Sequence, residues 1–126
     1  MTTTTPDTST ATTTPGSTPT VVRVAHDGHW LTVCDLELLS PGRGAAVLLP
    51  DGGQAALFMD RAGVVRAIGN RDPFTGAYVL SRGLLGSAGG RPFVASPLLK
   101  QRFDLETGAC LDDEEVSVAV YAVRVE

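Results

Sequence analysis

Short apolar runs separated by glycine-containing turns follow one another along most of the chain after residue 20. The runs at 44–49, 54–59 and 64–68 are each five or six residues long, and turns lie between them. This spacing is typical of a β-meander, which builds sandwiches and small barrels. No segment has the 3.6-residue period of a long helix, although 78–85 could hold a short helical turn. The pattern therefore predicts an all-β domain of antiparallel strands.

The clearest local signal is the dipeptide Asp27-Gly28, which lies between two β-prone runs. Asp-Gly favours a type I′ turn, so the two runs are predicted to form a hairpin with His26 opposite His29. A pair of histidines at this spacing raises the question of a zinc site. A structural zinc ion needs four ligands, and the two cysteines of the chain stand 76 positions apart. We therefore interpret both histidines as partly exposed turn residues.

The cysteines, Cys34 and Cys110, each follow or interrupt an apolar run. A disulfide is not expected in a reducing compartment, and a domain of this length can fold without one. Neither cysteine has a neighbouring histidine or a basic cluster that would lower the pKa of its thiol. Both are predicted to be small buried hydrophobic residues.

Residues 1–20 differ in composition from the rest of the chain, with eleven Thr, three Pro and two Ser. Such a segment cannot bury enough apolar surface to offset the entropy of ordering it, so we predict a disordered tail and one ordered domain over 21–126. The tail lacks the basic and apolar regions of a secretory signal. We accordingly expect a cytoplasmic protein.

The net charge and the hydropathy limit the classes of partner that this chain could bind. The net charge is -4, with ten Lys and Arg among fourteen acids, and this balance argues against nucleic-acid binding. No apolar run approaches the roughly 18 residues that a membrane-spanning helix needs, so no membrane association is expected. A length of 126 residues allows a single hydrophobic core.

Two proline-centred loops organise the second half of the chain: Asp72-Pro73-Phe74 and Ser96-Pro97-Leu98-Leu99. A glycine-rich connection separates them, and the sequence Phe-Asp-Leu-Glu-Thr-Gly at 103–108 follows. This layout resembles a Rieske iron-sulfur domain, in which the loops read Cys-Pro-His and Cys-Pro-x-His before a similar hairpin. The resemblance implies a Rieske-like sandwich or small barrel with a two-loop cluster-binding subdomain.

The residues at the ligand positions have changed. The alignment places Asp72 and Ser96 where the resemblance implies cysteines, and Phe74 and Leu99 where it implies histidines. A Rieske cluster needs two thiolates and two imidazoles, and phenylalanine and leucine have no lone pair to offer a metal. Only Asp72 is a plausible metal ligand. We therefore predict a degenerate site that holds no cluster and no metal.

Several phrases in the same order make the resemblance more specific. They are Trp-Leu-Thr-Val-Cys at 30–34, Val-Leu-Ser-Arg-Gly at 79–83, Val-Ala-Ser-Pro-Leu at 94–98 and Cys-Leu-Asp-Asp at 110–113. Together they resemble the small subunit of NAD(P)H-dependent assimilatory nitrite reductase. In that family the large subunit carries FAD, an iron-sulfur cluster and sirohaem and reduces nitrite to ammonium. The resemblance implies that this chain has no cofactor of its own and that the large subunit is its partner.

Two roles are open for the loop residues. Phe74 could pack against Leu98 or Leu99 as an apolar plug, which would replace the cross-link that a cluster supplies. Alternatively, the loop tips form an exposed patch that contacts the large subunit. The two readings are compatible if Phe74 is the plug while Leu98, Arg82 and Lys100 project outward. The candidate partner contacts are therefore Phe74, Arg82, Leu98 and Lys100.

Three functional hypotheses follow. The first is a non-catalytic subunit that supports the assembly or activity of a cytoplasmic nitrite reductase. The second is a Rieske-type ferredoxin that transfers electrons to an oxygenase, and it requires bound iron. The third is a stand-alone enzyme with Asp72 as a general base, which lacks a neighbouring His, Lys or second carboxylate in the sequence. The first hypothesis explains the most residues.

Overall fold

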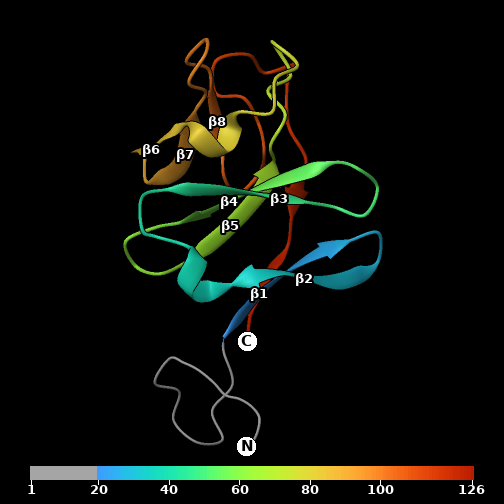
Figure 1. Cartoon of the computed structure of the whole chain (residues 1–126). Helices are drawn as coiled ribbons and strands as arrows, with labels where there is room; N and C mark the ends of the chain where they lie inside the picture. The colour runs from blue at the N-terminus through green and yellow to red at the C-terminus, as the bar shows by residue number, and fades with distance from the viewer. Residues whose placement is uncertain (1–19) are drawn as a thin grey trace, which may run out of the picture.

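The computed structural model describes residues 20–126, which form ten short strands and two three-residue 3-10 turns (Figure 1). The prediction of an all-β domain is confirmed. The tail predicted over 1–20 lies outside the described residues except for Thr20, whose carbonyl oxygen accepts a 2.9 Å hydrogen bond from the Leu36 N–H. Among residues 20–126 no helix has the length and apolarity needed to cross a membrane.

Two antiparallel sheets form the lower two thirds of the molecule in Figure 1, with the strand orders β10-β1-β2 and β3-β4-β5-β9. The strands are β1 (Val21–His26), β2 (His29–Asp35), β3 (Gly44–Leu48), β4 (Gln54–Met59), β5 (Val65–Gly69), β9 (Val120–Tyr121) and β10 (Val123–Val125). The sheets join between β9 and β10, where the Ala25 N–H donates to the Ala122 carbonyl oxygen at 2.9 Å. On the opposite side, β2 and β3 are both edge strands, so the barrel is open between them.

These sheets test the strand predictions. The meander is confirmed, because β3, β4 and β5 pair in sequence order. The C-terminal apolar run over 116–125 forms two short strands, with β9 in the second sheet and β10 beside β1. The predicted hairpin is also confirmed: Asp27 and Gly28 have φ of 54° and 80°, as a type I′ turn requires, and His26 pairs with His29.

Strands β4 and β5 are the central layer and are buried on both faces. Successive side chains of β4 point to opposite faces of the sheet, so Leu57 lies in one core, here called the lower core, and Phe58 lies in a second, the upper core. The lower core also contains Val22 and Val24 of β1, whereas Phe103 lies in the upper core. Burial on both faces explains why the sequence of β4 is continuously apolar rather than alternating.

The upper core is covered by a small subdomain that carries both proline-centred loops. It contains the sheet β6 (Leu84–Ala88), β7 (Arg91–Ala95) and β8 (Arg102–Asp104), in that order, and the 3-10 turn η2 (Leu80–Arg82). The turn η2 confirms the short helical turn predicted within 78–85. The first loop precedes η2 and the second joins β7 to β8, so both loops lie at the top of the molecule in Figure 1.

Asn70 fixes the first loop to the central layer. Its side chain is 1% exposed, and its Oδ1 accepts a 2.7 Å hydrogen bond from the Ser81 N–H of η2. Its Nδ2 donates to Gln54 Oε1 of β4 at 2.9 Å. One amide therefore joins the meander to the loop-bearing subdomain.

Candidate functional site

The two proline-centred loops have the same backbone structure. In the first loop, the Asp72 N–H donates to the Ala77 carbonyl oxygen at 2.8 Å, and the Gly76 N–H donates to the Asp72 carbonyl oxygen at 2.7 Å. In the second loop, the Ser96 N–H donates to the Gln101 carbonyl oxygen at 2.8 Å, and the Lys100 N–H donates to the Ser96 carbonyl oxygen at 3.1 Å. Each loop is a closed turn that begins at the residue, Asp72 or Ser96, that the resemblance assigns to a Rieske cysteine.

The first residues of the two loops meet inside the subdomain. Asp72 and Ser96 are both 0% exposed, and the Ser96 hydroxyl donates a 2.6 Å hydrogen bond to Asp72 Oδ2. Asp72 Oδ1 accepts a second bond from the Phe74 N–H at 2.8 Å. We refer to the Asp72–Ser96 contact as the buried latch. It joins the two loops at positions that the resemblance assigns to the two thiolate ligands.

The residues at the predicted histidine positions lie farther out. Phe74 is half-buried and packs on Phe103 of the upper core, with ring centroids 6.3 Å apart. Leu98 and Leu99 are 49% and 54% exposed. Phe74 therefore packs into the upper core, whereas Leu99 is more exposed than the predicted apolar plug implies. A contact between Phe74 and either leucine stays a prediction. The tight turn directs both leucines to solvent, and the Phe103 ring occupies the space beneath Phe74.

The loop residues do not fit a 2Fe-2S cluster. They offer one carboxylate and one hydroxyl, already hydrogen-bonded to each other, and two hydrocarbon side chains, whereas the cluster needs two thiolates and two imidazoles. Over the range 20–126, no three His, Cys, Asp or Glu side chains gather in a group that could hold a metal. These loops therefore do not offer the four side chains that a 2Fe-2S cluster needs.

The histidines flank the β1–β2 turn, whereas Cys110 lies in the upper core on which Phe74 packs. His26 is partly exposed, as predicted, with its Nε2 3.2 Å from Asp51 Oδ2, and His29 is exposed. Cys110 is buried as predicted, whereas Cys34 is only partly buried. Desolvation, assisted by the charge of Asp35, raises the pKa of the Cys34 thiol, so this sulfur is not activated as a nucleophile.

A third turn, at 104–109, repeats the structure of the two loops. The Asp104 N–H donates to the Ala109 carbonyl oxygen at 2.9 Å, the Gly108 N–H donates back to that of Asp104 at 2.8 Å, and Asp104 Oδ1 accepts from the Glu106 N–H at 2.7 Å. The sequence signal is the motif Asp-x-x-Thr-Gly-Ala, which occurs at 72–77 and again at 104–109. Sequence reasoning found both turns but missed their equivalence.

An alternating chain of charges links this third turn to the meander. The Arg66 guanidinium lies 2.9 Å from Asp60 Oδ2 and 3.5 Å from Glu106 Oε2. The Arg91 guanidinium lies 3.9 Å from Oε1 of the same Glu106 and 2.6 Å from Asp104 Oδ2. Asp104 is the buried member, at 2% exposure. The network therefore joins β5 of the meander to β7 and β8 of the loop-bearing subdomain.

Asp104 should make the stability of the domain depend on acid pH. Burial raises the pKa of this carboxyl group, but hydrogen bonds from Arg91 and from the Glu106 and Thr107 N–H groups outweigh it and hold the pKa below its ordinary value. A depressed pKa in the folded state contributes stability above the unfolded pKa of about 4, and this stability disappears as the pH falls through the folded value. Urea unfolding between pH 7 and pH 2 should show a steep acid limb, that is, a steep fall of the free energy of unfolding at the acid end of this range. Asp104→Asn should flatten that limb because the titrating group is gone. Arg91→Met should also make it shallower, because without the guanidinium the folded-state pKa of Asp104 rises toward the unfolded value. The same limb in all three proteins would contradict this assignment.

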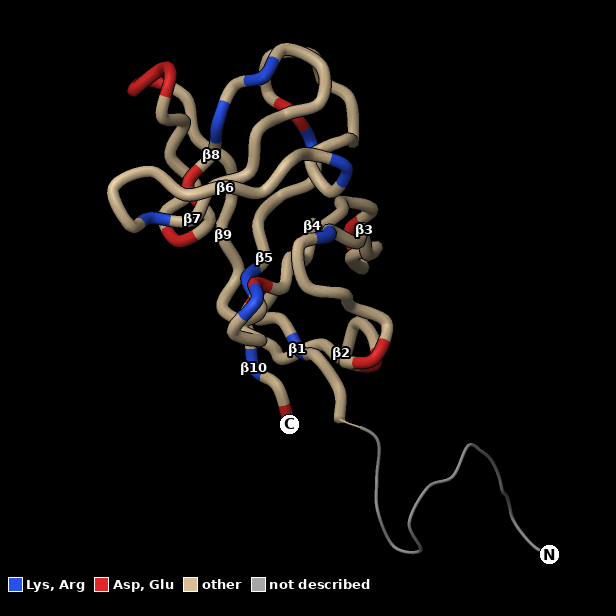
Figure 2. Tube along the Cα trace, turned by 90° about the vertical axis from the view of Figure 1, so that its left-hand side faces the viewer, with Lys and Arg blue, Asp and Glu red and all other residues tan. Residues whose placement is uncertain are grey.

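The surface around the loop tips is apolar and basic. Tyr78, Leu98 and Leu99 are about half exposed, and Arg82 and Lys100 are exposed without an ion pair to any residue of 20–126. Figure 2 shows basic segments gathered at this end of the molecule, with an acidic turn to one side. An apolar patch with free cations beside it is typical of a protein-binding surface.

Comparison with known proteins defines first the class and then the family. A family described as a Rieske-like 2Fe-2S domain matches residues 29–126, so the fold and the two loops are those of a Rieske-like domain. The nitrite reductase (NADH) small subunit of Salmonella typhimurium is 45% identical over 98 residues, covering 77% of this chain and 90% of that protein. The chain belongs to the family of nitrite reductase small subunits.

Two further relatives refine the comparison. A crystal structure from Mycobacterium tuberculosis, assigned as an NADH-dependent nitrite reductase small subunit, shares 51% identity and a TM-score of 0.71, covering 83% of this chain and 86% of that one. A nitrite reductase large subunit of Klebsiella oxytoca is 45% identical over 98 residues, which are 77% of this chain but 10% of that protein. In that relative the small domain is part of the large polypeptide.

Proposed function

We propose that this chain is the non-catalytic small subunit of a cytoplasmic NAD(P)H-dependent nitrite reductase. In this proposal it binds a large subunit that carries FAD, an iron-sulfur cluster and sirohaem, and it supports assembly or activity of the complex that reduces nitrite to ammonium. The observation that carries the proposal is the fused relative, because a domain 45% identical to this chain forms 10% of a nitrite reductase large subunit. The loop chemistry supports a role without electron transfer, since the Asp72–Ser96 contact stands at the inner ligand positions.

We also propose that the loop tips contact the large subunit through Phe74, Arg82, Leu98 and Lys100. Leu98 offers an exposed apolar side chain, and Arg82 and Lys100 offer exposed cations. Phe74 is half-buried: part of its ring packs on Phe103 and holds the first loop in place, and the rest is accessible at the loop. The complementary surface on the large subunit would be apolar with acidic groups around it.

The proposal is tested by reconstitution. The tagged chain is co-expressed with the sirohaem-containing large subunit of the same organism, and nitrite-dependent NAD(P)H oxidation is measured with and without it. We expect a stable complex, lower activity when the small chain is omitted, and at least tenfold weaker association for Leu98→Asp, because a charge would enter an apolar contact.

The matched control is Val64→Asp, an equally exposed apolar position in the turn between β4 and β5. It should leave association unchanged. Absence of a complex together with full activity of the large subunit alone would refute the subunit assignment. Iron and a Rieske-type visible spectrum in the purified chain would instead favour the ferredoxin hypothesis.

A further inference from the structure

The open side of the barrel, between β2 and β3, forms an apolar groove that the loop-based proposal does not use. Both strands are edges of their sheets, and the groove between them has a volume of about 720 Å³. Its lining includes Leu31, Val33, Leu38, Val47 and Leu48, and none of the residues that line it is charged. The groove is therefore suited to hydrocarbon side chains rather than to an ion.

The edges of the groove are unusually apolar for a free surface. Leu38 of η1 (Leu36–Leu38) and Leu48 of β3 are 71% and 75% exposed. The whole of β3 is Gly-Ala-Ala-Val-Leu, without a charged residue. Exposed edge strands normally carry charges, proline or bulges that prevent pairing with other chains. An unprotected edge beside an apolar groove is the arrangement that accepts an extended segment of a partner.

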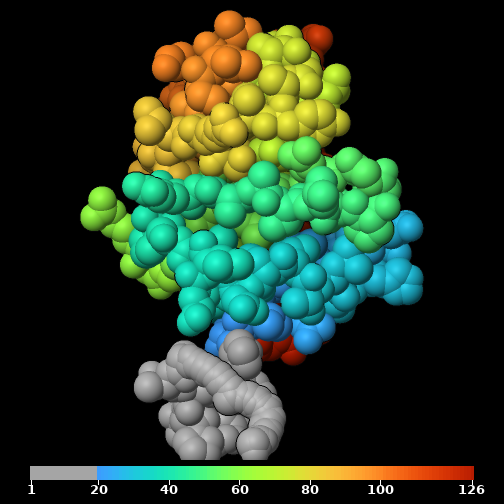
Figure 3. Space-filling model, viewed as in Figure 1, coloured from blue at the N-terminus to red at the C-terminus, as the bar shows by residue number. Residues whose placement is uncertain are grey.

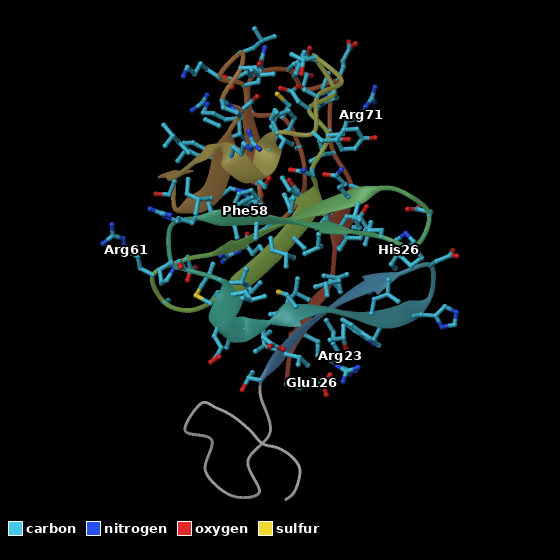
Figure 4. The ribbon with its side chains drawn as sticks, in the orientation of Figure 1. Arg23, His26, Phe58, Arg61, Arg71 and Glu126 are labelled. Carbon is cyan, nitrogen blue, oxygen red and sulfur yellow. The ribbon has the colours of Figure 1, made fainter. Side chains whose placement is uncertain are left out.

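The groove lies on the side of the barrel, and one of its walls, η1, is next to the place where the chain enters and leaves the domain. The Val21 N–H and Glu126 carbonyl oxygen are 2.9 Å apart, and the reverse bond measures 3.0 Å. Figure 4 shows Glu126 at this end and Arg71, beside the first loop, at the opposite end. The Leu36 N–H bonds to Thr20, so the start of the domain is attached to η1, whose Leu38 lines the groove. In Figure 3, the blue and teal side chains of β2, η1 and β3 occupy the lower front face.

The fused relative is the reason for choosing the large subunit as the occupant of the groove. Nine tenths of that polypeptide lie outside the shared domain, and either end of the domain would connect to them beside η1. We infer that an extended apolar segment of the nitrite reductase large subunit lies in this groove along the free edge of β3. The inference rests on the proposed function, and it adds a second contact surface that shares no residue with the loop tips. Backbone hydrogen bonds to β3 would give affinity, and Leu38 and Leu48 would cover the segment.

Two substitutions in the full chain test the inference in the reconstituted complex. Leu48→Asp and Leu38→Asp should each weaken binding of the large subunit at least tenfold while leaving the urea midpoint of the isolated chain unchanged, because both side chains are exposed. The control is Leu84→Asp, which alters an equally exposed leucine, 74% exposed, on β6 outside the groove. Hydrogen exchange should show new protection of residues 44–48 in the complex.

The outcomes separate this inference from the proposed function. If the wild-type chain fails to bind the large subunit, both are wrong. If the wild-type chain binds and the Leu48→Asp chain binds equally well, with residues 44–48 unprotected, only the groove assignment is wrong. If Leu48→Asp abolishes self-association of the isolated chain and leaves large-subunit binding intact, the groove is an interface between copies of this chain, and the inference is overturned.

Discussion

Replacement of Asp72 by alanine is expected to lower the free energy of unfolding by about 3 kcal/mol. The substitution removes the buried carboxylate that accepts two hydrogen bonds, one of 2.6 Å from the Ser96 hydroxyl and one of 2.8 Å from the Phe74 N–H. A buried donor without a partner costs about 1–3 kcal/mol, and bonds to a charged group lie at the upper end of the usual range. The loss should appear as a lower urea midpoint without a change in slope.

A double-mutant cycle isolates the latch from the rest of the loop. Ser96→Ala alone leaves the Asp72 carboxylate buried with one partner fewer, and we expect a loss of about 2 kcal/mol. The double variant should lose less than the sum of the two single losses, because each single variant already loses the same Asp72–Ser96 bond. Asp112→Ala is the control: this carboxylate makes several bonds to Arg102, but at the surface, where such pairs contribute less than about 1 kcal/mol. Equal losses for Asp72→Ala and Asp112→Ala, or strict additivity in the cycle, would show that the latch does not hold the loops together.

The latch gives a physical account of a Rieske-like fold without Rieske ligands. In a Rieske domain the cluster cross-links the two loops, and its ligands divide into two thiolates and two imidazoles. At the two positions that the resemblance assigns to the thiolates, a hydrogen bond between Asp72 and Ser96 joins the loops. At the two positions that it assigns to the imidazoles stand Phe74, which packs on the upper core, and the exposed Leu99. The loops therefore present hydrocarbon and basic groups at the position where an electron-transfer protein would present its cluster ligands.

The sequence predicted those features that are encoded locally. The Asp27-Gly28 hairpin, the meander over 44–68 and the two loops all follow from turn chemistry and apolar runs of a few residues. The latch joins residues 24 positions apart and depends on how the subdomain closes, so no local pattern encodes it. The exposure of Leu99 was missed for the same reason. An apolar residue near a proposed core was assigned to that core, whereas the turn geometry directs it to solvent.

The groove between β2 and β3 shows a related limit. Apolar residues at both edges are the ordinary signal for a buried strand, and the sequence alone cannot tell an edge strand from a central one. Only the strand order shows that both strands lack a neighbour on one side. The same feature that made the meander predictable, a run of uncharged residues at 44–48, therefore becomes informative about binding once its position in the sheet is known.

Gly108→Ala is expected to lower the free energy of unfolding by about 4 kcal/mol, a large fraction of the stability of a typical domain. Gly108 has a φ of 77°, and an alanine in this left-handed conformation costs about 1–2 kcal/mol. A Cβ here would also collide with the backbone carbonyl oxygen of Val118, which lies on the segment leading to β9. That segment is held by the 2.8 Å bond from the Val118 N–H to the Gly108 carbonyl oxygen, so it cannot move away without separating the third turn from the C-terminal strands.

Gly76→Ala distinguishes the collision from the backbone strain. Gly76 occupies the equivalent position of the first loop, with a nearly identical φ of 78°, but a Cβ there would meet only the flexible guanidinium of Arg71. Its loss should therefore be limited to about 1–2 kcal/mol from the left-handed conformation. Urea unfolding of the two variants measures the difference directly, and similar midpoints would mean that the contact between the third turn and the C-terminal segment does not determine the stability of the fold. A selective loss in Gly108→Ala would show that this turn, the structural twin of the two loops, couples the loop-bearing subdomain to the barrel, so that a partner bound at either end acts on one cooperative unit.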